Sequence, residues 1–214
     1  MNDLETQQIS QKRSHYYSKK YNRFFNSIKC NAVFRPDSYL ETCFMRELEF
    51  QTDVEIYKAQ PKSYIYKYKG ELSRYTPDFL IKYIDGSHEF IELKISHRFD
   101  NEKFNHRFSI LKEFFLDRYN IPLVASRNTD IDNGFKIENL FKLYNYKKFD
   151  LKPFNLQKIK DSLSNINCLG ELYAAVGNFN CSNALAPALI AQNIVKTDLS
   201  LKFSPKNFAE INNG

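Results

Sequence analysis

The sequence predicts an α/β fold in which a mixed sheet is flanked by helices, followed by a smaller helical region. Two apolar, β-prone segments, 79–84 and 90–95, are joined by Asp85-Gly86, a pair typical of tight hairpin turns. Segments with helical periodicity precede and follow this hairpin, and residues 121–126 read as one more buried strand. Antiparallel strands combined with a strand reached through a helix indicate a mixed sheet.

The helix before the hairpin has the clearest start signal. Ser38 is expected as its N-cap with Glu41 three residues later, the capping-box spacing, and the helix is expected to reach about Gln51. Short strands are expected at 54–57 and 63–68, separated by Gln60-Pro61. After the hairpin, the spacing predicts helices over 104–119 and 137–146.

Composition limits the possible environments of the chain. Hydrophobic residues make up 43% of its 214 residues, enough for a packed core, and no apolar run is long enough to cross a membrane. The start of the chain lacks a secretory pattern, so a cytoplasmic protein is expected. The four cysteines form no C-x-x-C pair, which argues against a zinc site and a disulfide framework. The net charge of +6 permits a polyanionic partner.

A change of composition near residues 149–153 divides the chain into an expected catalytic domain at 1–150 and a small domain at 151–214. The second part holds only six basic and four acidic residues. Its pattern predicts helices at 156–163, 169–176 and 182–191 and strands at 194–199 and 202–204, the outline of a winged helix. Because the third helix carries no Lys or Arg, a protein-binding or structural role is favoured over reading of DNA bases, with the apolar run 184–190 as the surface.

The central hairpin carries the residues with chemical potential. Asp78 precedes its first strand, and Glu92 and Lys94 lie on the same face of its second strand because side chains alternate with a period of two. Neighbouring carboxylates repel unless a divalent cation such as Mg²⁺ or Mn²⁺ neutralises them, and a lysine beside them can orient an attacking water. The pattern indicates a metal-dependent phosphodiester hydrolase. The alternative is a pair of strands with unrelated surface charges.

A third acid is expected from the helix before the hairpin, which offers Glu41, Glu47 and Glu49. On a helical wheel Glu47 falls inside the apolar stripe, Glu41 at its edge, and Glu49 points away from it. This geometry leaves Glu41 and Glu47 open, and a capping role is the alternative for Glu41.

The N-terminal 35 residues contain seven Lys or Arg against two acids, with aromatic residues between them. Such a segment can follow a phosphate backbone and stack on bases. The alternative is a solvated arm packed by its tyrosines. The expected DNA contacts are Lys12, Arg13, Lys19, Lys20 and Arg23.

Pro-Asp followed by Glu-x-Lys resembles the pattern of restriction-endonuclease-like nucleases. The wider series Ser38-Tyr-Leu-Glu41, Leu48-Glu-Phe, Gln60-Pro61, Tyr75-Thr-Pro-Asp-Phe-Leu-Ile and Glu92-Leu-Lys94 resembles the catalytic domain of TnsA, the endonuclease subunit of Tn7-like heteromeric transposases. The resemblance covers roughly residues 25–150. It implies catalytic acids at Glu41 and Asp78 and the strand lysine at Lys94. Where some members carry Gln, this chain has Glu92, which makes a fully acidic metal site expected.

The resemblance also implies a function and partners. It implies Mg²⁺-dependent cleavage of double-stranded DNA at the 5′ ends of a mobile element. A DDE transposase would cut the 3′ ends, and an AAA+ ATPase regulator would contact the C-terminal region. The expected location is the cytoplasm, at the nucleoid when acting. Alternatives are another restriction-like nuclease or junction resolvase, and a catalytically silent DNA-binding scaffold subunit.

Overall fold

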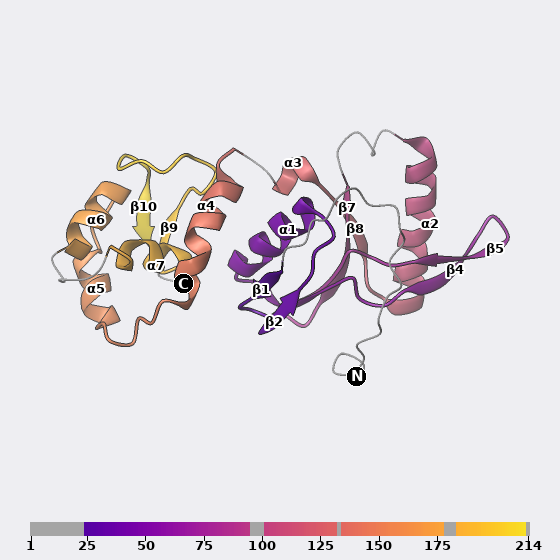
Figure 1. Cartoon of the computed structure of the whole chain (residues 1–214), viewed down its shortest axis with the longest axis horizontal. Coiled ribbons are helices and arrows are strands. Elements are labelled where there is room, and N and C mark those ends of the chain that lie inside the picture. The colour runs from indigo at the N-terminus through magenta and orange to yellow at the C-terminus, as the bar shows by residue number, and fades with distance from the viewer. Residues whose placement is uncertain (1–23, 95–100, 132–133, 178–182, 213–214) are drawn as a thin grey trace.

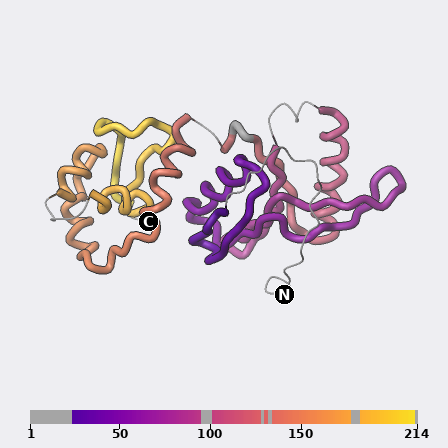
Figure 2. The backbone as a smooth tube through the Cα atoms, viewed as in Figure 1, coloured from indigo at the N-terminus to yellow at the C-terminus, as the bar shows by residue number. Residues whose placement is uncertain are grey.

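The structure of the chain is a computed structural model that describes residues 24–94, 101–131, 134–177 and 183–212 (Figure 1). The backbone forms two lobes, which Figure 2 traces from the indigo and magenta N-terminal part to the orange and yellow C-terminal part. No helix among the described residues is long and apolar enough to cross a membrane.

The N-terminal lobe is built on a four-stranded sheet with the order β3-β6-β7-β8. The pairs β3–β6 and β6–β7 are antiparallel, whereas β7–β8 is parallel because α2 makes the crossover between them. The expected mixed α/β sheet is therefore confirmed. The elements of the sheet and its helices are β3 (Val54–Ala59), β6 (Phe79–Tyr83), β7 (His88–Lys94), β8 (Leu123–Arg127), α1 (Tyr39–Phe50) and α2 (Glu102–Tyr119).

Each face of this sheet is covered by its own helix and its own core. Ile91 and Leu93 of β7 point toward α1, where they pack with Met45 and Leu48. Phe90, on the opposite face of the same strand, packs instead with the core under α2, which includes Leu111 and Phe115. The alternation along β7 therefore places Glu92 and Lys94 on the α2 side of the sheet.

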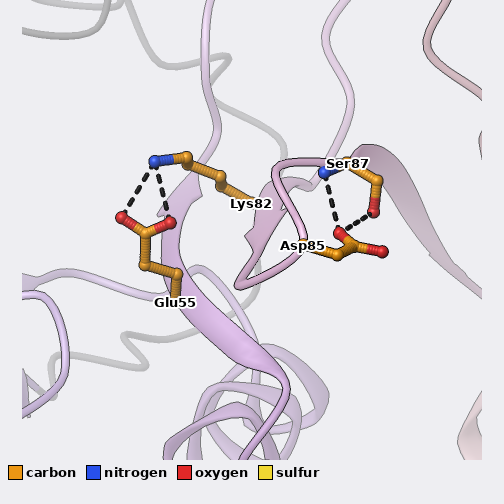
Figure 3. A network of polar contacts seen from close by, with 4 residues as sticks. All are labelled: Glu55, Lys82, Asp85 and Ser87. Atoms are coloured by element: carbon orange, nitrogen blue, oxygen red, sulfur yellow. Dashed lines mark hydrogen bonds and ion pairs between the residues drawn. The ribbon is translucent and has the colours of Figure 1, made fainter.

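The turn between β6 and β7 has the predicted form. Gly86 has φ +86°, a left-handed conformation that favours glycine, and its N–H donates to Tyr83 O at 3.0 Å. Asp85 accepts bonds from the N–H and Oγ of Ser87, which holds the pKa of its carboxyl below the usual value (Figure 3). Beside the turn, Lys82 and Glu55 form an exposed ion pair at 2.8 Å (Figure 3).

Two antiparallel hairpins supplement the main sheet, and the sequence predicts their strands only in part. β4 (Tyr64–Tyr68) was expected, but its partner β5 (Glu71–Tyr75) was not. The pair β1 (Phe25–Ser27) and β2 (Ala32–Phe34) lies in the segment whose composition indicates only a basic character. These strands are short or mostly polar, so their pairing depends on tertiary contacts rather than on a clear alternation.

The described residues of the C-terminal lobe form three helices and a two-stranded antiparallel sheet, close to the expected outline. Its elements are α5 (Leu156–Ser162), α6 (Leu169–Gly177), α7 (Leu185–Ala191), β9 (Val195–Thr197) and β10 (Ala209–Ile211). The prediction of a second strand at 202–204 was wrong. The N–H of Gly170 donates to Pro205 O and that of Leu169 to Asn207 O, so residues 205–207 run along the start of α6 before pairing begins.

The third helix also has a different role from the expected one. Every residue of α7 is buried, and the helix forms the centre of the C-terminal core with Leu163, Leu172 and Val195. The apolar run predicted as a protein-binding surface is therefore interior. A short helix that is apolar on all sides is buried, and the smallness of this lobe leaves it no exposed face.

The two lobes are joined through α4 (Lys136–Leu143) and a 3₁₀ turn, η2 (Tyr144–Lys148); a short helix, α3 (Asn128–Ile131), precedes them. Ile137 and Leu140 of α4 belong to the core under α1, whereas Leu143 belongs to the C-terminal core. The buried Asn139 side chain donates to Leu199 O and Leu201 O, at 2.9 and 2.7 Å. One helix thus contributes to both hydrophobic cores.

Candidate active site

Asp78 and Glu92 lie side by side where β6 begins. In the β6–β7 register Phe79 faces Ile91, so Asp78, one residue earlier, lies opposite Glu92. The Oδ2 atom of Asp78 accepts a bond from the backbone N–H of Leu93 at 2.6 Å. The hairpin thus brings together the two acids that the sequence pattern pairs, and a strand N–H fixes one of them.

Two side chains orient the buried carboxylate of Glu92. The Tyr75 hydroxyl donates to Oε2 at 2.6 Å, and the Lys94 ammonium forms an ion pair with Oε1. Burial, followed by the nearby charge of Glu92, raises the pKa of the Tyr75 hydroxyl, so it stays protonated and acts as a donor. The sequence offers Tyr75 only as part of a family motif, because its role as a donor depends on β5, which was not predicted.

Asp78 has a raised proton affinity. The pKa of Asp78 is raised to about 7, first by burial and then by the charges of Glu92 and, more weakly, Glu41, while the Leu93 N–H and Lys94 act in the opposite direction. Carboxylates that increase one another's pKa are concentrated at functional sites, because a structural core gains nothing from such repulsion. Glu92 and Glu41 are therefore both close enough to Asp78 for their charges to raise its pKa.

Glu41 combines its place near Asp78 with the predicted cap. Its Oε1 accepts from the Ser38 hydroxyl at 2.9 Å and its Oε2 from the Asp37 N–H at 3.0 Å, while Ser38 Oγ accepts from the Glu41 N–H. Burial raises the pKa of Glu41 above its usual value. The capping role therefore applies to this residue, and its part in a metal site stays a prediction.

Gln60 ties the start of α1 to the start of β6. Its side-chain amide donates to Asp37 Oδ2 at 2.6 Å, and its backbone N–H donates to Asp78 O at 2.7 Å. It has φ +43°, a left-handed conformation that is strained for a residue with a side chain. The sequence signal at this position is Gln60-Pro61, which predicts a break between strands and not these two contacts.

The other two acids of α1 are committed elsewhere. Glu47 forms an ion pair with Lys136 of α4, which separates it from the hairpin. Glu49, which is predicted to point away from the apolar stripe, is only 1% exposed, because β1 and the turn after it cover that side of the helix. It accepts four bonds, from Ser27 Oγ, Tyr57 OH and the backbone N–H groups of Ile28 and Lys29.

A cavity of about 310 Å³ opens beside Glu92 and Lys94. It lies between the end of β5 and the first turns of α2. The residues lining it are Arg74, Tyr75, Thr76, Glu92, Lys94, Phe104, Arg107, Phe108 and Leu111. The acid pair is therefore next to a recess that is lined by cationic and aromatic side chains.

The donor set suits a hard divalent cation, because it consists of carboxylates without thiol or imidazole groups. In the part of the chain that the structure describes, no three His, Cys, Asp or Glu side chains already form a cluster able to hold one ion. Both Glu92 oxygens contact Tyr75 or Lys94 instead. The predicted DNA contacts Lys12, Arg13, Lys19, Lys20 and Arg23 lie outside the described residues.

Comparison with known families supports the interpretation of this hairpin. Residues 47–123 match the family model described as TnsA-like endonuclease N terminal. The matched segment contains Asp78, Glu92 and Lys94, as well as Tyr75 and Arg107, whereas Glu41 precedes it. A search of curated proteins found no match. The strands β3, β6 and β7, which carry the acid pair, therefore lie in a segment that is similar to the N-terminal endonuclease domain of the TnsA-like family.

Proposed function

We propose that this chain is the metal-dependent endonuclease subunit of a Tn7-like transposase, which cleaves DNA at the 5′ ends of the mobile element. The observation that supports it best is the acid group of Asp78, Glu92 and Glu41 beside Lys94, inside or next to a segment that matches the TnsA-like family. Neighbouring carboxylates repel one another, and a divalent cation that binds their oxygens removes this repulsion.

The proposed cation is Mg²⁺, with Mn²⁺ as a substitute, held by Glu41, Asp78 and Glu92. When bound, it would supply Lewis-acid stabilisation of charge on the scissile phosphate and would lower the pKa of a bound water. Loading of the site would require Glu92 to exchange at least one of its present partners, Tyr75 or Lys94, for the cation.

The chain's own residues position these groups. The Leu93 N–H fixes one oxygen of Asp78, and the Tyr75 hydroxyl fixes one oxygen of Glu92. Lys94 lines the cavity, and the proposed role of its ammonium is to bind a phosphate oxygen and orient the attacking water. Since a proton on Asp78 weakens cation binding, loading is favoured above about pH 7.

The proposed partners are a DDE transposase that cuts the 3′ ends and an AAA+ ATPase regulator that contacts the C-terminal lobe. With α7 buried, that contact must use exposed side chains such as Tyr173 and Phe208, which are 47% and 54% exposed. Exposed aromatic residues are typical of protein interfaces. The basic N-terminal segment, Lys12 to Arg23, is proposed to contact DNA phosphates.

The test is cleavage of duplex DNA carrying the ends of the element, with Mg²⁺ or Mn²⁺, in the presence and absence of the transposase from the same element. We expect nicks at the 5′ ends that depend on metal and on the partner. Lys94→Ala should reduce cleavage far more than metal affinity measured by calorimetry. Lost metal affinity with normal cleavage would contradict the role of Lys94. Cleavage at sites unrelated to the ends of the element would favour a restriction-like nuclease.

A further inference from the structure

Two arginines beside the acid pair have no part in the proposed metal chemistry. Arg74 comes from the end of β5 and Arg107 from the second turn of α2, and both line the cavity that contains Glu92 and Lys94. Figure 1 shows the β4–β5 hairpin and α2 next to each other at this side of the lobe. Residues far apart in the sequence therefore present cations to one recess.

Arg107 is held in place by tyrosines rather than by an acid. Its Nε donates to the Tyr66 hydroxyl at 2.5 Å, and its guanidinium lies 5.7 and 5.8 Å from the ring centres of Tyr66 and Tyr68. Among the ion pairs within the described residues, none includes Arg74 or Arg107. A guanidinium bound through Nε still offers donors on its two Nη groups.

The cavity lining carries an excess of positive charge. Lys94 is balanced by Glu92, whereas Arg74 and Arg107 have no acidic counterpart in the lining. Guanidinium groups have fixed, planar donors, and two of them match the geometry of a phosphate better than a single point charge does. An anionic group is therefore the occupant that the charge of the cavity favours.

The remaining wall of the cavity is aromatic. Phe104 and Phe108 of α2 have ring centres 5.4 Å apart and planes inclined by 17°. Lys94 Nζ lies 5.6 Å from the Phe104 ring centre, so this wall adjoins the acid site. A ligand with an anionic end and a flat apolar portion fits both walls, and a nucleotide of a DNA strand has these two parts.

We propose that this cavity receives the nucleotide next to the scissile phosphate. The phosphate of that nucleotide binds Arg74 and Arg107, and its sugar or base lies against Phe104 and Phe108. The inference rests on the proposed function, because it places a DNA strand at the adjacent acids. It assigns Arg74 and Arg107 as positioning residues that fix the register of the strand.

The test compares Arg74→Gln/Arg107→Gln with the control Lys82→Gln/Lys112→Gln, each in the full chain carrying Asp78→Asn so that the probe stays intact. Lys82 lies beside the β6–β7 turn. Lys112 is an exposed residue of α2, about 140° around the helix from Arg107. Both pairs remove two positive charges. Anisotropy of a fluorescein-labelled duplex with a single-stranded 5′ tail is measured over a series of KCl concentrations.

The arginine pair should lower the magnitude of the slope of log affinity against log salt by about one, because the single phosphate that both arginines bind loses its cations. The control pair should leave the slope unchanged, and Arg107→Lys should restore part of it. Phe104→Leu should weaken binding of the tailed duplex without altering the slope. Equal slopes for the arginine and control pairs, with matching thermal midpoints that establish folding, would overturn the proposal.

Cleavage kinetics separate this inference from the proposed function. On an otherwise unaltered chain with its transposase, the arginine pair should raise KM with little change in kcat, as expected for a contact made equally in ground and transition states. Metal-dependent cleavage with equal salt slopes would refute only the cavity proposal. Absence of cleavage with any divalent metal, together with the predicted slope difference, would refute only the endonuclease assignment.

Discussion

Asp78 is the residue whose environment differs most from that of an ordinary surface acid. Burial, followed by the charges of Glu92 and Glu41, raises its pKa to about 7, and in the proposed function a bound cation would relieve this repulsion. Sequence spacing could predict the pairing of Asp78 with Glu92, because both lie on one hairpin. It could not predict Tyr75 or Arg107, whose hydroxyl and guanidinium reach the site through tertiary contacts.

The raised pKa of Asp78 predicts an unusual dependence of stability on pH. Between about pH 4 and 7 the folded chain binds a proton on Asp78 that the unfolded chain has released, so stability falls as the pH rises through this window. Asp78→Asn removes the charge and can still accept the Leu93 bond. It should therefore raise the free energy of unfolding at pH 8 by roughly 1–3 kcal/mol.

Urea denaturation in metal-free buffer with a chelator at pH 5 and pH 8 measures this effect. The control is Asp85→Asn, because hydrogen bonds from Ser87 hold the pKa of Asp85 low and its contribution is lost as the pH falls. An Asp78→Asn variant that is less stable than the unaltered chain at pH 8 would show that the charge of Asp78 does not destabilise the fold.

At the scale of single elements, α1 is predictable at its start and unexpected on its outer side. Ser38 caps the helix as the capping-box pattern predicted. On a helical wheel Glu49 lies away from the apolar stripe, but a wheel cannot show that β1 and the turn after it cover this residue. The same limit applies to β10, which pairs with β9 across residues 198–208, whereas β5 pairs with the adjacent β4 but lacks a clear alternation.

Glu49 is therefore predicted to be a structural anchor. Glu49→Leu leaves two hydroxyls and two backbone N–H groups without their acceptor and should destabilise the fold by about 3–5 kcal/mol. Glu49→Gln should cost less, because its amide oxygen can serve the N–H groups while the hydroxyls turn to accept. Thermal and urea unfolding measure both, with the exposed Glu55→Gln as control. Equal costs for Leu and Gln at position 49 would contradict this account.

At the scale of the whole molecule, the change of composition near residues 149–153 marks the C-terminal lobe but misses its connection. Leu143 lies in the C-terminal core, and the Gln192 side chain donates to Phe149 O at 2.8 Å. Composition reports where charge becomes sparse, whereas a shared helix is visible only in the packing. A division of the chain at residues 150 and 151 is therefore predicted to leave α4 without part of its cover.

The shared helix predicts that the two lobes unfold together. Calorimetry of the full chain should show one transition, and Asn139→Ala, which removes both bonds to the 199–201 segment, should broaden or split it. A chain ending at Phe149 should melt at a lower temperature than the full chain. Two well-separated transitions in the unaltered protein would show that the lobes are independent.

The most direct test of the central claim is metal-dependent nicking at the ends of the element by Glu41→Gln, Glu47→Gln and Asp78→Asn, assayed with Mn²⁺ and the partner transposase. Glu41 and Asp78 belong to the acid group, whereas Glu47 is paired with Lys136. We predict that Glu41→Gln and Asp78→Asn abolish nicking while Glu47→Gln retains it. Nicking at the unaltered rate by Asp78→Asn, or its loss only in Glu47→Gln, would contradict the assignment of the site.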